Sequence, residues 1–460
     1  MDYDVVVIGG GAGGLGAARA AVGRGARTLL VDRGPLGGEC TFTGCVPSKA
    51  LIEAADRGAD FADAMAAVHA SVASIAATED DEALQREGVD VMHGSARLRG
   101  PGVIDIDGTS VTARRIVLAT GTGPAIPPID GLDEVAYLTN ETVFDLTELP
   151  RSLAVVGGGA IGCELAQAFA RLGSHVTVIE AADRLLAGED RDASIVVASM
   201  FAASGIVVRT GCSVVRAESA GVGGAATLRL DNGDAVAADA VLVAVGRTPS
   251  TDALHLDAAG VRLDDRGFVR ANAHLRTTVR GVFAVGDVTG LSLFTHAADE
   301  MGRVAAANAL RRWPQRRFRA ERMPRVTYTD PEVAHVGLSE ADVAARGGRV
   351  SFVPMTAVDR AVTAGRTEGF VKLMVGPRLL TRNLAGGRIL GATVDAPRAG
   401  EILHELVLAI RTGMFPARIA LTVHAYPTWS AAVRQAAAQL FIDVNGRRAE
   451  PARPHGHLSD

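Results

Sequence analysis

The sequence predicts an α/β protein with two Rossmann-like dinucleotide-binding domains. Two stretches each combine an apolar strand, a G-x-G-x-x-G turn, a helical segment and a second apolar strand that ends on a carboxylate. The composition agrees with this fold, because 48% of the residues are hydrophobic, 22% are charged and only 4% are aromatic. A chain of 460 residues exceeds what one core usually organises, so we expect several domains.

The first nucleotide motif lies close to the N-terminus. Residues 4–16 read DVVVIGGGAGGLG, and a second apolar run, TLLVD, ends on Asp32. Glycines let the backbone approach a pyrophosphate at a helix N-terminus, and a carboxylate at the end of the second strand accepts hydrogen bonds from ribose hydroxyls. We therefore predict a dinucleotide site formed by Gly9, Gly11, Gly14 and Asp32.

The same pattern recurs between residues 152 and 180, where Gly157, Gly159 and Gly162 form the turn and Glu180 ends the second strand. Such a repeat implies two ligands, or one ligand and a decayed copy. Because neither copy has lost a glycine, we favour two ligands.

Glu180 also bears on the choice of nicotinamide. A carboxylate at this position pairs with a free 2′-hydroxyl and would repel the 2′-phosphate of NADP. NAD is therefore favoured, and Arg184, four residues downstream, keeps NADP as the alternative.

Two cysteines, Cys40 and Cys45, lie in the segment GGECTFTGCVPSK, residues 37–49. In an undistorted helix, residues five apart have Cα atoms roughly 8.6 Å apart, whereas a disulfide tolerates about 7 Å. A turn must therefore separate them if they pair, and Gly44 supplies the backbone freedom.

The residues after the second cysteine favour a reactive thiol. Pro47 can open a helix, which would leave Cys45 just before a helix N-terminus with Lys49 four residues on. These conditions depress a thiol pKa.

A redox pair is not the only reading of two close cysteines. They could form half of a structural zinc site, or they could simply be buried small side chains. Zinc would require a second pair, and the other two cysteines, Cys163 and Cys212, stand alone. We therefore favour the redox pair and predict no metal site.

Charge and hydropathy limit which partners and which cellular location we expect. The formal net charge of −5 argues against nucleic acid as a partner. A strand-like run begins within three residues of Met1, which leaves no room for a signal peptide, and no apolar stretch reaches membrane-spanning length. We expect a cytoplasmic protein, in which a close cysteine pair is more often catalytic than a structural crosslink.

Together these motifs resemble the class I pyridine nucleotide-disulfide oxidoreductases, the flavoprotein family of dihydrolipoamide dehydrogenase, glutathione reductase and mercuric reductase. The resemblance runs from Tyr3 to about Phe441. It includes RIVLATGTGP, residues 115–124, which is similar to the second flavin motif of the family, and GVFAVGDVTG, residues 281–290, which is similar to the third. The resemblance implies FAD at the first fingerprint and the nicotinamide at the second.

The order of domains follows from the same resemblance. It implies an FAD-binding domain that is interrupted by the nicotinamide domain and followed by an α+β domain that forms a homodimer. The expected boundaries are 1–148 (FAD, first part), 149–248 (NAD(P)), 249–322 (FAD, continuation), 323–450 (dimerisation) and 451–460, a polar tail that we expect to be disordered.

The resemblance also implies roles for individual residues. Electrons would pass from the nicotinamide through the flavin to a Cys40–Cys45 disulfide, with Cys45 as the charge-transfer thiolate beside the flavin and Cys40 as the interchange thiol. Lys49 would lie near the reactive nitrogen of the flavin with Glu164 as its carboxylate partner. The remaining expected ligand residues are Thr120, Gly121, Asp287 at the ribityl chain and His296 for FAD, and Gly246 for NAD(P).

The chain departs from the family pattern near its C-terminus. Disulfide reductases of this family carry a His-Pro motif whose histidine, oriented by a glutamate, serves the interchange thiol as acid and base. Here the position before Pro427 is Tyr426, and the glutamate position is Ala431. His424 is a weak candidate for a substitute base, and Tyr426 would line the substrate pocket.

The missing pair of residues leaves the acceptor open. Proton transfer by such a histidine contributes about a hundredfold to ten-thousandfold. A tyrosine here resembles mercuric reductases, yet their C-terminal cysteine pair is absent from the tail RRAEPARPHGHLSD. We predict an FAD-dependent enzyme that reduces a small disulfide, a metal-thiol species or a quinone; the alternatives are a redox-sensing flavoprotein and a purely structural dimer.

Overall fold

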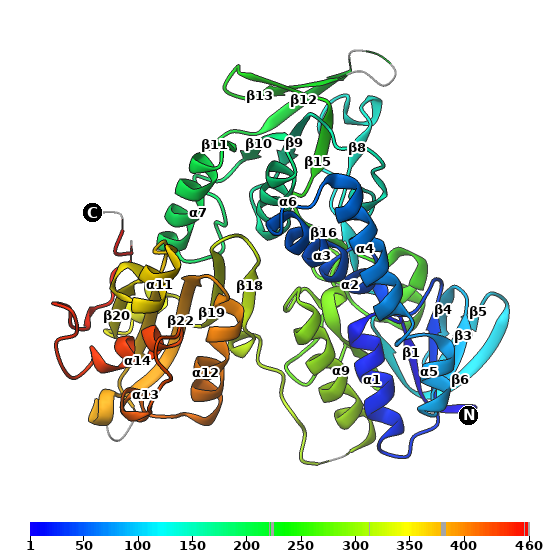
Figure 1. The fold of residues 1–460 in the computed structure, drawn as a ribbon. Coiled ribbons are helices and arrows are strands. Elements are labelled where there is room, and N and C mark those ends of the chain that lie inside the picture. The colour runs from blue at the N-terminus through cyan, green and yellow to red at the C-terminus, as the bar shows by residue number, and fades with distance from the viewer. Residues whose placement is uncertain (220, 222–224, 312, 379–382, 455, 459–460) are drawn as a thin grey trace. The chain divides into compact units, whose positions relative to one another are not determined.

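The computed structural model describes residues 1–460 except 220, 222–224, 312, 379–382, 455 and 459–460 (Figure 1). The chain divides into two compact units. The first comprises Met1–Pro127, Leu138–Glu148 and Val245–Ala320, and the second comprises Pro128–Tyr137, Leu149–Ala244 and Glu321–Asp460.

A parallel sheet forms the centre of the first unit. Its strands lie in the order β3-β2-β1-β6, and β17 pairs with β6. Four residues of β1 are buried, which explains the continuous apolar run in the sequence. The strands are β1 (Tyr3–Ile8), β2 (Thr28–Asp32), β3 (Asp90–His93), β6 (Thr109–Leu118) and β17 (Val282–Ala284); β4 (Ala96–Gly100) and β5 (Val103–Ile106) continue from β6 as antiparallel strands.

Two helices of the first unit, α1 (Ala12–Val22) and α9 (Thr295–Leu310), lie side by side (Figure 1). Their backbones approach closely, because a Cβ atom on Gly302 would lie 2.3 Å from the carbonyl oxygen of Gly13 and 3.0 Å from the carbonyl carbon of Gly16. Only glycine permits this spacing, so the position of α9 is fixed by the helix that follows the first fingerprint.

The second unit begins with its own parallel sheet, in which four strands follow the order β11-β10-β9-β15. Helix α6 connects β9 to β10 and begins at the second fingerprint. The elements are β9 (Ser152–Val156), α6 (Ala160–Arg171), β10 (His175–Glu180), α7 (Arg191–Ala203), β11 (Val207–Thr210) and β15 (Ala240–Val243), with an antiparallel sheet of β12 (Val214–Ser219), β13 (Ala226–Leu230) and β14 (Ala235–Ala238).

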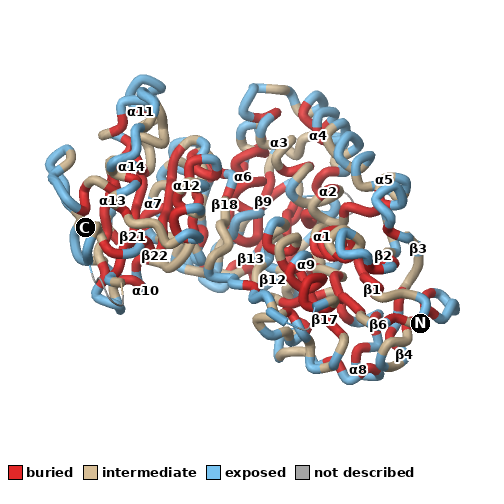
Figure 2. The backbone as a smooth tube through the Cα atoms, turned by 90° about the horizontal axis from the view of Figure 1, so that it is seen from below, coloured by how far each residue is buried: buried red, intermediate tan, exposed pale blue. Residues whose placement is uncertain are grey.

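The C-terminal part of the second unit is an antiparallel six-stranded sheet in the order β18-β19-β22-β21-β20-β23. All seven residues of β21 are buried, and the strand is drawn red in Figure 2. The parallel sheets of the two units give the α/β part of the predicted fold, and this C-terminal sheet gives the α+β part. The elements are β18 (Arg325–Thr327), β19 (Glu332–Gly337), α10 (Glu340–Ala344), β20 (Arg349–Pro354), β21 (Phe370–Gly376), β22 (Arg388–Ala396), α12 (Ala399–Thr412), α14 (Ala431–Ala438) and β23 (Glu450–Pro451).

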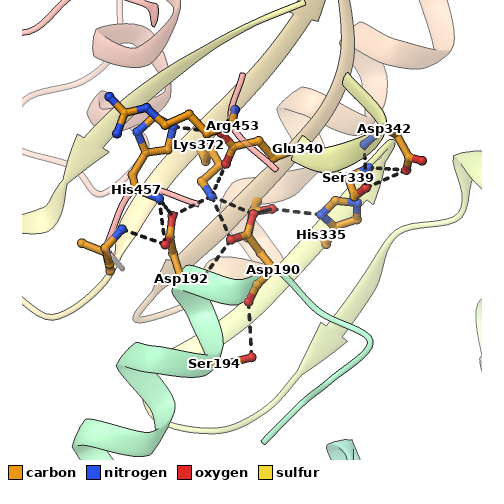
Figure 3. Close-up of polar contacts among 12 residues, drawn as sticks. Asp190, Asp192, Ser194, His335, Ser339, Glu340, Asp342, Lys372, Arg453 and His457 are labelled. Atoms are coloured by element: carbon orange, nitrogen blue, oxygen red, sulfur yellow. Dashed lines mark hydrogen bonds and ion pairs between the residues drawn. The ribbon is translucent and has the colours of Figure 1, made fainter. Parts of the chain in front are cut away.

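A buried lysine joins the two parts of the second unit (Figure 3). Lys372 on β21 is 0% exposed, and its Nζ lies 2.8 Å from Asp190, 2.8 Å from Asp192 and 2.7 Å from Glu340. Burial alone would favour the neutral amine, but the three carboxylates raise the pKa of Lys372 above its ordinary value. The cluster therefore holds the N-terminus of α7 against the C-terminal sheet.

The polar tail is not wholly disordered, contrary to our expectation. The backbone N–H groups of His457 and Leu458 donate to the carboxylate of Asp192, at 2.8 to 3.0 Å, and the His457 ring stacks on Phe352. Burial alone would raise the pKa of Glu340. The hydrogen bond from His457 and the charge of Lys372 outweigh burial and lower this pKa to about 2. The tail is thus ordered by a carboxylate that Lys372 keeps in place.

The expectation that no apolar stretch is long enough to span a membrane is wrong for one segment. Residues Phe61–Arg86 are long and apolar enough to cross a bilayer by length and composition alone. The segment is interrupted, because α4 (Phe61–Ala76) ends before α5 (Asp81–Arg86) begins. A single stretch of this kind is weak evidence for a membrane span.

Removing the buried lysine should destabilise the second unit strongly. We expect Lys372→Met to lower the free energy of unfolding by about 3–5 kcal/mol, because three carboxylates would stay buried without their cation. Chemical denaturation measures this loss. As a control, Arg57→Met removes an exposed ion pair with Glu53 and should cost less than about 1 kcal/mol; equal losses in the two variants would contradict the assignment.

Candidate active site and nucleotide sites

The first fingerprint has the geometry of a pyrophosphate cradle. Gly9 has φ +110°, and a Cβ atom on Gly14 would lie 1.8 Å from the carbonyl oxygen of Gly9. In contrast, a Cβ atom on Gly11 would meet only the Cα atom of Gly38, at 3.8 Å. The Asp32 carboxylate accepts from the N–H groups of Gly10 and Gly34, so it is fixed at the end of β2. These residues fit the adenosine half of a dinucleotide.

The second fingerprint repeats this geometry. Gly157 has φ +113°, and a Cβ atom on Gly162 would lie 1.9 Å from the carbonyl oxygen of Gly157. No atom lies within 4 Å of the Cβ position of Gly159. Glu180 accepts from the N–H groups of Gly158, at 2.6 Å, and Ala182, at 2.7 Å. The site therefore fits a second dinucleotide.

The other expected flavin residues also lie in the first unit. The Thr120 hydroxyl donates to the carbonyl of Ser250 at 2.7 Å, and Gly121 has φ +67°. Asp287 follows β17, and burial raises its pKa above the ordinary value of an aspartate. Gly246 belongs to this unit as well, where its carbonyl accepts from Ala125, so it is not in the same unit as the other expected nicotinamide residues.

The two thiols lie on two consecutive helices that are close in the sequence. Cys40 lies in α2 (Gly38–Phe42), and Cys45 is the first residue of α3 (Cys45–Asp56). A Cβ atom on Gly44 would lie 3.2 Å from the Cα atom of Cys40, so glycine lets the start of α3 press against α2. The hydrogen bond with Cys45, together with burial, raises the pKa of the Cys40 thiol.

Helix α3 begins two residues earlier than Pro47 suggests. The amide of Ser48 donates to the carbonyl of Gly44, so Cys45 is already inside the first turn. The first amides of a helix have no partner within it, so Pro47, which lacks an N–H group, causes no loss there. Cys45 thus lies in the first turn of α3, at the positive end of the helix, a more favourable position for a thiolate than the one expected.

Helix α2, which carries Cys40, also contacts the first fingerprint through its backbone. Gly37 donates to the carbonyl of Gly10 at 2.9 Å, and Gly37 and Gly11 form a parallel bridge. A Cβ atom on Gly38 would lie 2.6 Å from the Cα atom of Gly11. The backbone that would hold a pyrophosphate and the backbone that carries Cys40 are therefore in direct contact.

Helix α9 brings Thr295 to the thiols and carries His296 beside it. The Thr295 Oγ1 atom lies 3.3 Å from the Sγ atom of Cys45. His296, the next residue, is exposed, and its ring stacks on Phe294 with centroids 5.6 Å apart.

Lys49 and Glu164 fall in different units. Lys49 is on α3, four residues after Cys45. Glu164 is on α6, 5% exposed, and accepts from the backbone N–H of Tyr328 at 2.8 Å. Their pairing stays a prediction from the family resemblance.

A buried network next to the thiols was not predicted from the sequence. The guanidinium of Arg247 bonds to the Glu39 carboxylate and to the hydroxyl of Thr122, and Asn140 donates to Glu39 at 2.8 Å. Thr122 in turn donates to Asp287 at 3.4 Å. The network connects the residue before Cys40 to the aspartate expected at the ribityl chain.

The C-terminal candidates have partners of their own. The Tyr426 hydroxyl donates to Asp359 at 2.8 Å, this bond raises its pKa, and the residue is 77% exposed. His424 Nε2 lies 3.1 Å from Glu405. In the described part of the chain, no three His, Cys, Asp or Glu side chains are grouped so that they could hold a metal.

Two of the missed features had a signal in the sequence. The chain contains only two lysines, Lys49 and Lys372, among many arginines, which marks both positions as requiring a compact cation. Glu39, adjacent to Cys40, implies a counter-charge such as Arg247. Thr295 had no such signal, because its role depends on where α9 lies.

Gly162 and Gly159 have different surroundings, so their alanine variants should differ in stability and in affinity for NADH. We expect Gly162→Ala to lower the thermal unfolding midpoint, because its Cβ would overlap the carbonyl of Gly157. Gly159→Ala should keep that midpoint but lose affinity for NADH, because its Cβ would occupy the space of the pyrophosphate. Thermal unfolding and NADH titration measure the two effects; unchanged affinity in Gly159→Ala would refute this site.

The scarcity of lysine gives a direct probe of Lys49. We expect acetylation of the FAD-free protein to modify Lys49, and added FAD to slow this reaction. Peptide mass spectrometry follows the rate, and Lys372, which is fully buried, serves as the internal control. If FAD leaves the rate unchanged, Lys49 does not lie beside the flavin.

Comparison with known proteins shows the family to which the chain belongs. A family model described as pyridine nucleotide-disulphide oxidoreductase matches residues 3–307, and the dimerisation domain of that family matches residues 323–437. Dihydrolipoyl dehydrogenase of Thermus scotoductus is 35% identical, with 95% of this chain and 97% of the relative covered. Mercuric reductase of Staphylococcus aureus is 31% identical, with 96% and 83% covered.

Among solved structures, the Cu(II) complex of RclA, an HOCl-induced flavoprotein disulfide reductase from Escherichia coli, is similar with a TM-score of 0.86 and 26% identity. It covers 95% of this chain and 99% of RclA. The predicted fold class is confirmed, and the dimerisation domain supports a homodimer. The chain belongs to the pyridine nucleotide-disulphide oxidoreductase family and is an enzyme that uses FAD and a pyridine nucleotide.

Proposed function

We propose that this enzyme reduces a small acceptor through a Cys40–Cys45 disulfide, using electrons that NADH delivers by way of FAD. The observation that carries the proposal is the position of Cys45 at the first residue of α3, in the unit that contains the first fingerprint and Asp287. Bound FAD supplies the electron pair. The protein residues position the thiols, hold the proton on Cys40 and stabilise the charge on Cys45.

NADH is the proposed donor because of the contacts of Glu180 and Arg184. Glu180 is fixed by two backbone amides, where it suits a free 2′-hydroxyl. Arg184 donates to the carbonyl of Ala187 at 2.6 Å and pairs with Asp183. These contacts occupy the arginine that would otherwise bind the 2′-phosphate of NADPH.

The acceptor we propose is one with a low demand for acid catalysis. Tyr426 stands where the resemblance places the catalytic histidine, and a phenol whose pKa is raised by Asp359 is a poor proton donor that stays un-ionised, and so cannot act as a base, near neutral pH. A soft metal ion bound as a thiolate complex meets this condition, since no proton shuttle is required. Relatives named mercuric reductase and the Cu(II) complex of RclA support this class.

Two other acceptors remain candidates: a reactive disulfide, and a quinone reduced without the thiols. The remaining roles assigned above to Lys49, Glu164, His296 and Tyr426 are part of the same proposal, as are the domain boundaries. We also propose a cytoplasmic location, which suits a donor such as NADH.

An acceptor panel tests the proposal. The enzyme is reduced anaerobically with NADH or NADPH and mixed with Hg(II), Cu(II), lipoamide, low-molecular-weight disulfides or quinones, while flavin absorbance is followed. We expect NADH to reduce the enzyme faster, and a metal ion or a disulfide to reoxidise it quickly.

Cys40→Ser is the matched variant, with Cys163→Ser as the control because Cys163 is buried in α6 of the other unit. Cys40→Ser should lose reoxidation by the metal or disulfide and keep any reaction with quinones. Full-rate reoxidation of Cys40→Ser by every acceptor would show that the thiols are not on the electron path.

A further inference from the structure

We propose that Thr295 is a catalytic residue of the thiol step, whose hydroxyl donates a hydrogen bond to the Cys45 thiolate. This inference rests on the proposed function. It extends that function by naming a group that touches the reacting sulfur but lies in none of the sequence motifs.

The contact itself is the first argument. Thr295 Oγ1 lies 3.3 Å from Cys45 Sγ, and either group could donate while Cys45 is a thiol. A thiolate has no hydrogen and only accepts, so after ionisation the hydroxyl must be the donor. A hydrogen bond to the charged form favours that form.

The two helices that carry these residues add to the effect. Cys45 is the first residue of α3, and Thr295 is the first residue of α9. Neither helix has a side-chain hydrogen bond at its N-cap, which is Gly44 in α3 and Phe294 in α9. The first amides of a helix have no partner within that helix, and the positive N-terminal ends of two helices meet at this one contact.

The position of Thr295 is fixed by the packing of its helix. Gly302 on α9 presses against Gly13 and Gly16 on α1, so α9 cannot shift without a clash. The backbone that carries the hydroxyl is therefore placed beside Cys45 before the thiolate forms.

The charge balance of the reaction explains why Cys45 needs a donor. Reduction of the disulfide breaks the S–S bond and takes up two electrons and one proton, both supplied by the hydride of NADH through FAD. We place the proton on Cys40 and the negative charge on Cys45, because the hydrogen bond with Cys45 and burial raise the pKa of the Cys40 thiol more than a hydrogen bond from Thr295 lowers it. The titratable and charged groups on the packed elements include Cys40 on α2, Glu39 on α2 with its partner Arg247, Lys49 on α3, and His296 and Asp299 on α9.

The test separates the hydroxyl from the shape of the side chain. Thr295→Val removes the donor at similar volume, and Thr295→Ser keeps it. In the two-electron-reduced holoenzyme, the long-wavelength thiolate-to-flavin absorbance is titrated with pH. Loss of one hydrogen bond to a charged group should move the midpoint of the Thr295→Val titration up by about one pH unit, while Thr295→Ser should keep the wild-type midpoint.

A second readout does not depend on the flavin spectrum. In the Cys40→Ser background, the rate of Cys45 alkylation by iodoacetamide is measured against pH, and Thr295→Val should raise its midpoint equally. If Thr295→Val fails to fold, Thr295→Ala gives the same comparison. An unchanged midpoint in both assays would overturn the inference, as would an equal shift in Thr295→Ser and Thr295→Val.

The outcomes also distinguish this inference from the proposed function. If the wild-type enzyme shows no thiolate-to-flavin absorbance, the assigned role of Cys45 fails. The alkylation profile still decides whether Thr295 stabilises the thiolate.

Discussion

The close contact between two glycine-rich segments is the constraint on which the active site depends. Gly10 and Gly11 of the first fingerprint meet Gly37 and Gly38 of the thiol segment through one hydrogen bond and a backbone bridge. A side chain on Gly38 would overlap the Cα atom of Gly11. Because this contact involves backbone alone, it holds the first fingerprint directly against the N-terminus of α2. The position of Cys40 relative to a bound dinucleotide is therefore set by the fold and not by flexible side chains.

The choice between lysine and arginine also follows from the local structure. The chain has only two lysines: Lys49 lies four residues after Cys45 on α3, and Lys372 lies among three buried carboxylates. A compact ammonium fits where a planar guanidinium would need more space and more acceptors. At Arg247, in contrast, a guanidinium with several N–H donors is required, since it contacts Glu39 and Thr122 at once. The type of cation thus follows the geometry of its site.

The sequence predicted the features that depend on local patterns. Both fingerprints, their terminal carboxylates and the cysteine pair were identified from spacing, because glycine and cysteine are needed there for reasons that act within a few residues. The start of α3 was predicted two residues late, since Pro47 is tolerated inside a first turn as well as at its start. The order of the tail was missed because it depends on Asp192, which lies more than 260 residues away from His457.

Features that depend on contacts between distant segments could not be predicted. Thr295 reaches Cys45 across 250 residues, and Arg247 reaches Glu39 across 208. Each needs the packing of α9 on α1, or of β16 (Arg247–Pro249) on β7 (Thr122–Pro124), before it acquires a role. A single sequence shows the residues of such pairs but not their proximity.

The central claim is that the thiol pair stores electrons beyond those held by the flavin. Anaerobic titration with NADH tests it most directly, because it counts the electrons that each subunit accepts. The account predicts two equivalents of NADH per FAD in the wild-type enzyme, one for the disulfide and one for the flavin, and a single equivalent in Cys45→Ser. Complete reduction of the wild-type enzyme by one equivalent would contradict the account.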